Sequence, residues 1–343
     1  GKNGEVIPNH LPINELNITE KASYRHRGVC IEGSVYQEGL LDLLDWLPKV
    51  SMNAYFLQFL EPSVFLRRYY TNIKGHELTG EEIEGMSKVI RDEIVKRSLI
   101  FHDVGHGWTC AAIGIDKHEI HKEPEHITEE QRNMLALVNG RREFWRHIPL
   151  NTNLCYSDPK VCEIMTDKIL DYCIEHEDVD YLHFWIADDG NNNCECEECV
   201  RQRASDPYVK MLNLLDEKMT ANNVNTKIVF LIYNGLRWAP LTERVKNKDR
   251  FVMMLAPFLR DYTKPFDASL PMKLPPYELN RQAPLTTDLA EHLSYYKDWR
   301  TTFDGDSFDF DYHCLVEFLY ELTGYRLAKV LYQDIVNFEE LGL

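Results

Sequence analysis

The chain has 343 residues, 44% of them hydrophobic, and a formal net charge of −17. A chain of this length can form one large α/β domain or two smaller ones. Its negative charge argues against nucleic acid and anionic membranes as partners, because both bind basic surfaces, and no apolar run reaches the roughly 18 residues of a membrane span.

The first third of the chain is predicted to alternate strands and helices. Residues 1–22 are polar, and we expect a linker or the end of a preceding domain there, followed by one domain over 23–343. Thr79 and Glu82 have the spacing of a capping box at a helix start. Buried strands are expected at 27–33, 54–59 and 99–104, and helical periodicity marks 40–47 and 83–94.

The rest of the chain continues this alternation after an interruption. Residues 114–151 are rich in charged side chains, and we expect them at the mouth of the domain. Asp158 and Pro159 have the pattern of a helix start, with the aspartate as N-cap. Strands are expected at 181–187, 227–233, 251–256 and 308–312, and helices at 161–173, 208–219, 285–299 and 325–338.

Strands that alternate with helices predict a parallel sheet covered by helices. The chain has neither a dinucleotide-binding glycine motif nor a phosphate-binding loop, which disfavours an open nucleotide-binding sheet. Acids, amides and aromatic residues follow the strands, as in barrels whose active site lies at the carboxyl ends of the strands. We therefore predict a (β/α)8 barrel of the TIM type, with its eighth strand beyond Leu343.

Two adjacent acids, Asp188 and Asp189, follow the strand at 181–187 and precede a glycine and three asparagines. Paired carboxylates there suit glycoside hydrolysis, in which one acid protonates the departing oxygen. The second can act indirectly: when the sugar carries an acetamido group, the oxygen of that group attacks, and the carboxylate holds its N–H. Like charge on the neighbour favours the protonated form of one acid. The alternative is that the two acids only cap the following turn.

Cys194, Cys196 and Cys199 form a C-x-C-x-x-C run directly after the asparagines. Three thiolates at this spacing suit a tetrahedral zinc site that lacks one ligand, and Cys155 is the candidate fourth ligand. Such a site would be structural, because all-cysteine sites are usually closed. The alternative is a set of reduced thiols in a loop. Nine cysteines, an odd number, favour a reducing compartment, so we expect a cytoplasmic protein, or an exported one whose leader has been removed.

The motifs resemble those of two groups of glycoside hydrolases. They are Arg27-Gly28, Asn53, Gly105-His106 and the run from Trp185 to Gly190 with the cysteines after it. In this order they resemble the bacterial family-163 endo-β-N-acetylglucosaminidases and, more distantly, the family-20 hexosaminidases, from Arg27 to Leu343. Family-20 enzymes carry Asp-Glu where this chain carries Asp-Asp, a pair that the O-GlcNAc-removing enzymes also use.

The resemblance implies a retaining, substrate-assisted hydrolysis of N-acetylhexosamine linkages. By this analogy Asp188 polarises the acetamido group and Asp189 is the general acid. Arg27 would hold sugar hydroxyls, Tyr233 would donate to the acetamido oxygen, and His106 would line the pocket. The other predicted substrate contacts are Glu32, Trp108, Asn234 and Tyr312.

Most of these supporting residues have a structural alternative. Arg27 could form an ion pair at the bottom of the barrel, and Glu32 could cap a turn. His106 and the aromatic residues could pack in the core or at the rim.

The sequence thus predicts a glycoside hydrolase that acts on N-acetylglucosamine-type linkages in glycans, with a carbohydrate as its partner and no cofactor required for catalysis. One alternative is a hydrolase of another sugar class, such as uronic-acid glycosides, whose carboxylate Arg237, Arg260 and Arg281 could bind. The other is a carbohydrate-binding barrel without catalysis.

Overall fold

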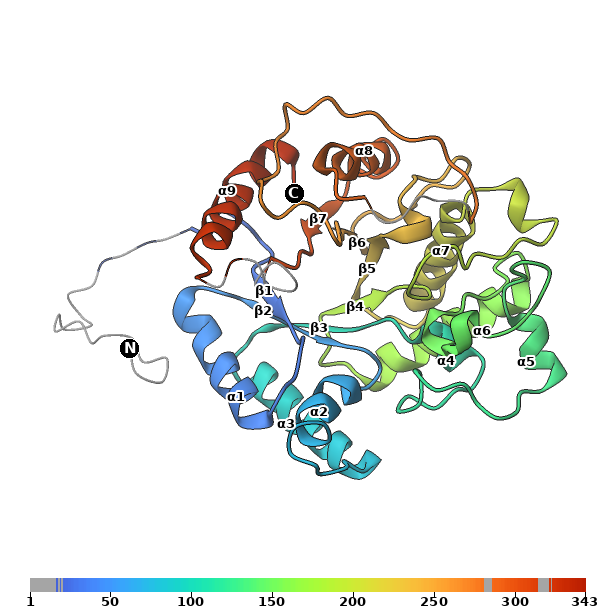
Figure 1. Cartoon of the computed structure of the whole chain (residues 1–343), viewed down its shortest axis with the longest axis horizontal. Coiled ribbons are helices and arrows are strands. Elements are labelled where there is room, and N and C mark those ends of the chain that lie inside the picture. The colour runs from blue at the N-terminus through green and yellow to red at the C-terminus, as the bar shows by residue number, and fades with distance from the viewer. Residues whose placement is uncertain (1–16, 18, 20, 281–285, 314–320, 322) are drawn as a thin grey trace. The chain divides into compact units, whose positions relative to one another are not determined.

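The computed structural model describes residues 17, 19, 21–280, 286–313, 321 and 323–343 (Figure 1). The chain forms two compact units. The first runs to Gly105 and includes His176–His183, and the second comprises His106–Glu175 and Phe184–Leu343. The expected N-terminal linker lies almost wholly outside the described residues.

The first unit contains three parallel strands, with Gly28 opposite Ala54 and Ala54 opposite Ile100. They are β1 (Gly28–Cys30), β2 (Ala54–Gln58) and β3 (Ile100–Gly105), connected through α1 (Gln37–Trp46), η3 (Leu47–Val50), α2 (Ser63–Tyr70) and α3 (Gly80–Lys96). The capping box predicted for α3 is confirmed. Thr79 Oγ1 accepts a hydrogen bond from the Glu82 N–H at 3.2 Å, and the Glu82 carboxylate accepts one from the Thr79 N–H at 2.9 Å.

Two histidines lie in the core of the first unit. Nδ1 of His102 on β3 is 2.9 Å from Nε2 of His183, and the His183 ring stacks on Phe56 of β2 with centroids 4.0 Å apart. Burial lowers the pKa of His102 to about 3, and burial also lowers the pKa of His183 well below its usual value. Both rings are therefore neutral in the folded protein at neutral pH.

The second unit contains another parallel ladder, in which Ile228 lies opposite Phe251 and Val252 opposite Asp306. Its strands are β5 (Lys227–Ile232), β6 (Phe251–Leu255) and β7 (Asp306–Asp309). The described helices of this unit are α4 (Trp108–Ala112), α5 (Glu129–Met134), α6 (Pro159–Glu175), α7 (Ser205–Ala221), α8 (Leu289–Arg300) and α9 (Tyr325–Leu341), with short turns η4 (Trp145–His147), η5 (Pro149–Asn151), η6 (Cys199–Arg201) and η7 (Asn234–Leu236).

Side chains fix two helices of this unit, and the sequence predicts the cap of the first. Asp158 caps α6, because its Oδ1 accepts a hydrogen bond from the Lys160 N–H at 2.9 Å. Trp299 of α8 packs on β5, where the centroid of its ring lies 5.4 Å from that of Phe230.

The chain passes from the first unit to the second after Gly105 and again within strand β4 (Tyr181–Phe184). The hydrogen-bonded order of the described strands follows the chain from β1 to β7. Within each unit the paired strands are parallel and follow chain order, which confirms the predicted alternation of strands and helices. The described strands do not close into a barrel, so closure and an eighth strand stay predictions.

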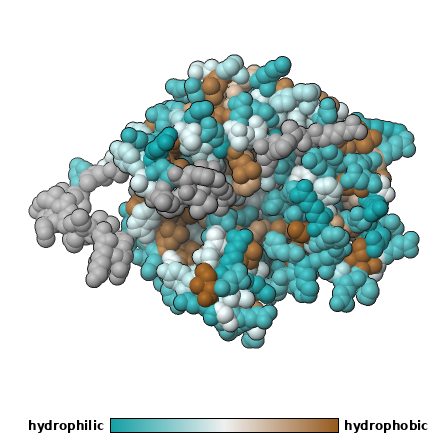
Figure 2. Space-filling model, viewed as in Figure 1, coloured by the Kyte–Doolittle hydropathy of each residue, from teal (hydrophilic) through white to brown (hydrophobic). Residues whose placement is uncertain are grey.

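Polar and charged side chains predominate on the face shown in Figure 2. Apolar side chains appear on it singly or in small groups. Among the described residues, no helix combines the length and the apolar character needed to cross a membrane.

Candidate active site

The chain leaves the sheet after Phe184 and turns at the two acids. Asp189 and Asn191 have φ angles of 67° and 58°, in the left-handed region that aspartate and asparagine adopt more easily than most side chains. Asp188 Oδ1 accepts a hydrogen bond from the Asp189 N–H, and Asp189 Oδ1 accepts one from the Gly190 N–H, both at 2.7 Å. Each acid thus caps the residue after it, as the structural alternative proposed, and each also has partners outside the turn.

Asp188 faces His106 and Tyr233. Its side chain is 39% exposed, and its Oδ1 lies 3.9 Å from Nε2 of the buried His106. His106 Nδ1 donates to the carbonyl oxygen of Ile186 at 2.6 Å, so this nitrogen carries a proton and Nε2 is the atom turned to the carboxylate. Burial raises the pKa of Tyr233, and the charge of Asp188 and a hydrogen bond to it raise this pKa further.

Asp189 has a different set of partners. Its Oδ2 accepts a hydrogen bond from the indole N–H of Trp145 at 3.1 Å and lies 2.8 Å from Nη1 of Arg146. Arg146 is 65% exposed, whereas Asp189 is 22% exposed. The Asn234 side-chain amide donates to the Asp189 carbonyl oxygen at 2.5 Å, so the predicted contact residue supports the backbone of the acid. The sequence did not single out Trp145 and Arg146, because they lie in the charged segment that has no structural periodicity.

Buried amide side chains hold the turn in place. Asn153 Oδ1 accepts a hydrogen bond from the Ala187 N–H at 3.2 Å, and its amide donates to Asn192 Oδ1 at 2.9 Å. Asn192 in turn donates to the Asp188 carbonyl oxygen at 2.6 Å. On the other side, Asn193 accepts at its carbonyl oxygen from Asn280 at 2.6 Å. The position of the acids is therefore set by hydrogen bonds that satisfy the backbone of the turn.

A continuous series of ring contacts runs from His106 to Tyr233. Its steps are His106–Trp185 at 4.9 Å, Trp185–Phe310 at 5.9 Å, Phe310–Tyr312 at 5.2 Å, Tyr312–Phe258 at 5.3 Å and Phe258–Tyr233 at 6.4 Å between centroids. The rings follow β3, β4, β5, β6 and β7, and the last four in the series are half-buried. Because both ends of the series lie beside Asp188, the series connects this acid with aromatic side chains that follow five strands.

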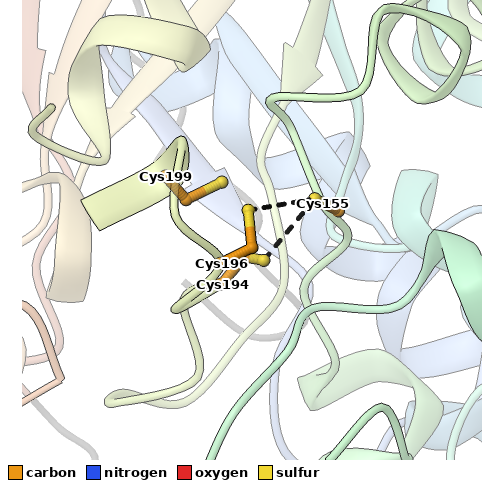
Figure 3. Close-up of side chains that lie close together, drawn as sticks. All are labelled: Cys155, Cys194, Cys196 and Cys199. Atoms are coloured by element: carbon orange, nitrogen blue, oxygen red, sulfur yellow. Dashed lines mark hydrogen bonds between the residues drawn. The ribbon is translucent and has the colours of Figure 1, made fainter. Parts of the chain in front are cut away.

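The structure brings the four predicted cysteines together (Figure 3). Their sulfur atoms all lie within 4.8 Å of one another. Cys155 Sγ is 3.5 Å from Cys194 Sγ and 3.7 Å from Cys196 Sγ. Cys155 and Cys194 are buried, and the other two are half-buried. These residues are the group of described side chains that best suits a metal ion with thiolate ligands.

Residues 1–280 match a family described as a domain of unknown function, DUF4838. The chain belongs to this family. The matched residues include Asp188, Asp189 and all four clustered cysteines, whereas Tyr312 lies beyond them. No curated protein matches the chain. The DUF4838 match leaves the resemblance to families 163 and 20 as a prediction.

Two solved structures are similar to the DUF4838 chain at low sequence identity. An O-GlcNAc hydrolase mutant from Thermobaculum terrenum gives a TM-score of 0.41 and 10% identity over 84% of this chain and 47% of that chain. The isomaltulose synthase of Klebsiella sp. LX3 gives a TM-score of 0.30 and 13% identity over 63% of this chain and 45% of that chain. The chain thus spans less than half of either structure, and at these TM-scores the likeness carries no argument about activity.

Three predicted contact residues lie outside this set of side chains. Trp108 is 1% exposed and packs against Tyr172 of α6, so it is a core residue and cannot contact a substrate in this structure. Arg27 precedes β1, and its Nε donates to the Ser51 carbonyl oxygen at 2.8 Å, which ties two strand starts together. Glu32 accepts a hydrogen bond from the Gly33 N–H at 2.9 Å, in keeping with the turn-capping alternative. A sugar contact by Arg27 stays a prediction from the resemblance alone.

Two of the three arginines considered for a sugar carboxylate, Arg237 and Arg260, are buried. Arg260 is fully buried, with Nε 2.7 Å from Asp311 and a second ion pair to Asp334 of α9. Arg237 is buried between the rings of Trp238 and Tyr295, 5.1 Å from each. Arg281 lies outside the described residues. The site around Asp188 therefore gains no support for the uronic-acid alternative from Arg237 or Arg260.

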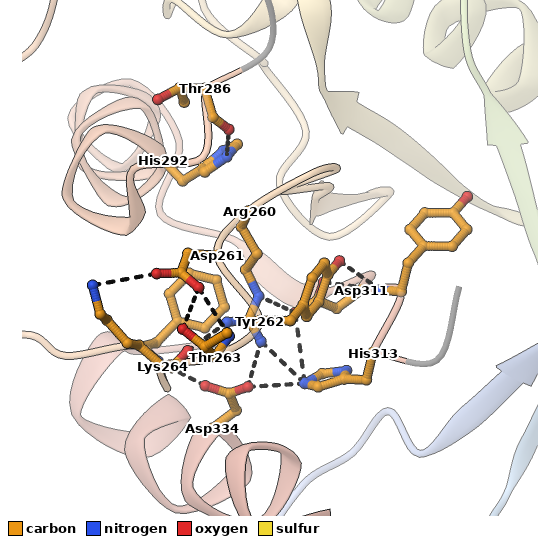
Figure 4. A network of polar contacts seen from close by, with 12 residues as sticks. Arg260, Asp261, Tyr262, Thr263, Lys264, Thr286, His292, Asp311, His313 and Asp334 are labelled. Atoms are coloured by element: carbon orange, nitrogen blue, oxygen red, sulfur yellow. Dashed lines mark hydrogen bonds and ion pairs between the residues drawn. The ribbon is translucent and has the colours of Figure 1, made fainter. Parts of the chain in front are cut away.

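Asp311, His313 and Asp334 also lie close enough to share a metal ion. Arg260 already supplies the positive charge among them, and His313 Nε2 is 2.8 Å from Asp334 Oδ2. This group is therefore a buried ion-pair network that joins α9 to the segment after β7 (Figure 4).

Proposed function

We propose that the chain is a glycoside hydrolase that cleaves N-acetylglucosamine-type linkages in glycans by a retaining, substrate-assisted mechanism. The observation that carries the proposal is the unequal surroundings of two adjacent carboxylates. Asp188 faces His106, Tyr233 and a series of aromatic rings, while Asp189 is held by Trp145 and Arg146. Unequal surroundings give two neighbouring acids different tasks.

In this mechanism Asp188 accepts a hydrogen bond from the acetamido N–H of the sugar. The acetamido oxygen then attacks the anomeric carbon, and the neutral hydroxyl of Tyr233 donates a hydrogen bond to the acetamido oxygen. The raised pKa of Tyr233 keeps this hydroxyl protonated through the working range of pH. His106 packs beside Asp188 and fixes its orientation.

Asp189 is the proposed general acid for the departing oxygen. After the leaving group has gone, the same carboxylate takes a proton from the water that opens the cyclic intermediate. Arg146 must move away before the departing oxygen can reach Asp189, because its guanidinium lies 2.8 Å from Oδ2 of this acid. The exposure of Arg146 is compatible with such a movement.

The test compares substrates and leaving groups. Aryl glycosides of N-acetylglucosamine, glucuronic acid and glucose, together with N-glycans, are incubated with the wild type, Asp188→Asn and Asp189→Asn. We expect hydrolysis of the N-acetylglucosaminides alone. Asp189→Asn should lose about 10²- to 10⁴-fold in rate on glycans and much less on dinitrophenyl glycosides, because a good leaving group needs no general acid.

Asp188→Asn should lose activity on both kinds of leaving group and lose inhibition by an N-acetylglucosamine thiazoline, which mimics the cyclic intermediate. Asp171→Asn, an exposed position on α6, is the matched control and should behave as the wild type. Cleavage of glucuronides alone would establish the uronic-acid alternative. Sugar binding without turnover by the wild type would establish the non-catalytic alternative.

A further inference from the structure

The four clustered cysteines have the spacing of a tetrahedral thiolate site. Zinc binds thiolates at about 2.3 Å, which places the sulfur atoms of a tetrahedron about 3.8 Å apart. The sulfur–sulfur distances of 3.5 Å for Cys155–Cys194 and 3.7 Å for Cys155–Cys196 are close to this value. All four sulfur atoms fall within 4.8 Å of one another, so one ion can contact every thiolate (Figure 3).

We propose that Cys155, Cys194, Cys196 and Cys199 bind one Zn²⁺ ion in a closed structural site beside the paired acids. The ion would have four protein ligands and no position for water or substrate, so its role is to fix the chain. The proposal depends on the cysteine geometry alone and holds whether or not the acids are catalytic.

Hydrogen bonds to the sulfur atoms support thiolate ligands. The Leu137 N–H points to Cys194 Sγ at 3.3 Å. Ser157 Oγ lies 3.3 Å from Cys155 Sγ and 3.4 Å from Cys196 Sγ. Donors of this kind orient metal ligands and offset their negative charge. The two buried members, Cys155 and Cys194, pack with Ala136. Hydrogen bonds from the protein, and not from solvent, therefore offset the negative charge of these two thiolates.

Other fates of the cysteines fit the geometry less well. A disulfide needs a sulfur–sulfur bond of about 2.05 Å, well below the 3.5 Å and 3.7 Å that separate Cys155 Sγ from Cys194 Sγ and Cys196 Sγ. An iron–sulfur cluster holds several iron and sulfide atoms between its cysteines and needs a larger cage than these sulfur atoms leave. A single iron ion would fit the same tetrahedron, so the element itself must be measured.

The ion would join two segments that flank the acids. Cys194 follows the turn that begins at Asp188. The neighbouring Glu195 binds the segment after α5 by two hydrogen bonds. Its N–H donates to the Leu137 carbonyl oxygen at 2.6 Å, and its carboxylate accepts from the Asn139 N–H at 2.8 Å. Cys155 lies two residues after Asn153, which holds the turn. Zinc would therefore strengthen a connection that the hydrogen bonds already make.

The experiment measures metal in the purified full chain, produced with zinc and iron both supplied. We expect one zinc per chain and no iron by elemental analysis. After removal of the metal under reducing conditions, Co²⁺ should give the visible absorption of tetrahedral thiolate coordination, a signal that does not depend on activity. Thiol titration should show four cysteines that react only after metal removal.

Cys196→Ser should lose the bound zinc, while Cys162→Ser should retain it. Cys162 is a suitable control because it lies outside the cluster, and its Sγ donates to the Tyr156 carbonyl oxygen at 3.3 Å, a bond that serine can replace. Wild-type protein with no metal, with iron, or with a disulfide among the four cysteines would overturn the proposal. Because none of these readouts uses a substrate, a failed glycosidase assay leaves the result intact.

Discussion

Arg146 Nη1 lies 2.8 Å from Asp189 Oδ2, which pairs the second acid with an exposed cation. The guanidinium therefore occupies the oxygen that a general acid would turn to the departing group. If Asp189 is the general acid, Arg146→Gln should free this oxygen. We expect kcat/KM of the variant with an aryl N-acetylglucosaminide to be higher than that of the wild type.

The matched control is Arg141→Gln, which removes an exposed arginine 3.9 Å from Glu143 in the same segment. Its kcat/KM should equal that of the wild type. An unchanged kcat/KM for Arg146→Gln would show that the pairing with Asp189 has no influence on the acid step.

Tyr233→Phe should lower kcat/KM by about 10²-fold, the usual loss when one donor to a developing charge is removed. The ring remains in place against Phe258, so the free energy of unfolding should change little. Tyr332→Phe, at an exposed position of α9, is the control for loss of a phenol hydroxyl. Wild-type kinetics of Tyr233→Phe would exclude the hydroxyl from the reaction.

Local sequence patterns predicted the elements well where the signal lies within a few residues. Thr79 with Glu82 and Asp158 with Pro159 mark the starts of α3 and α6 as expected. The last strand was predicted at 308–312, whereas β7 is Asp306–Asp309. The reason is non-local: Asp311 leaves the ladder to pair with Arg260, a partner that no sequence window contains.

In the candidate site, too, some contacts could be predicted from the sequence and others could not. His106 and Tyr233 meet Asp188 because residues that follow parallel strands gather at one edge, which the order of the elements predicts. The partners of Asp189 come from an aperiodic segment and were not predictable from spacing. Trp108 was expected beside a substrate. An aromatic residue that follows a strand can equally well pack in the core, and Trp108 is buried there.

The ion-pair network beside β7 predicts opposite effects for two aspartates. Asp334→Ala removes a carboxylate from fully buried Arg260 and should lower the free energy of unfolding by roughly 3–5 kcal/mol, the usual penalty of breaking a buried pair.

Asp309 is expected to behave differently. Burial, and then the charge of Asp311, raise the pKa of its carboxyl well above the usual value. The side chain is partly exposed, but its Oδ1 is buried and has no hydrogen-bond partner in the described structure.

The sign of the Asp309 effect follows from proton uptake. Above its usual pKa of about 3.9 the unfolded chain has lost this proton, while the folded chain keeps it up to the raised value, so stability falls as pH rises through that window. Asparagine imitates the protonated acid and removes this loss. We expect Asp309→Asn to be at least as stable as the wild type at neutral pH, in urea unfolding, and to lose any advantage in acid. A destabilisation equal to that of Asp334→Ala would contradict a protonated Asp309.

The buried histidines of the first unit predict sensitivity to acid. The pKa of His102 is about 3 in the folded protein and about 6.5 in an unfolded chain. Below about pH 6.5 the unfolded state therefore binds protons that the folded state does not bind. Each such histidine lowers the free energy of unfolding by up to about 1.4 kcal/mol for each unit by which the pH falls.

His183→Phe removes one of these proton-binding groups, and the new ring can still stack on Phe56. The slope of unfolding free energy against pH between 6.5 and 4.5 or so should become shallower by about one proton in this variant. His147→Gln, an exposed control that pairs with Glu123, should have a much smaller effect on the slope. Equal slopes for His183→Phe and the wild type would mean that this histidine takes up its proton without unfolding.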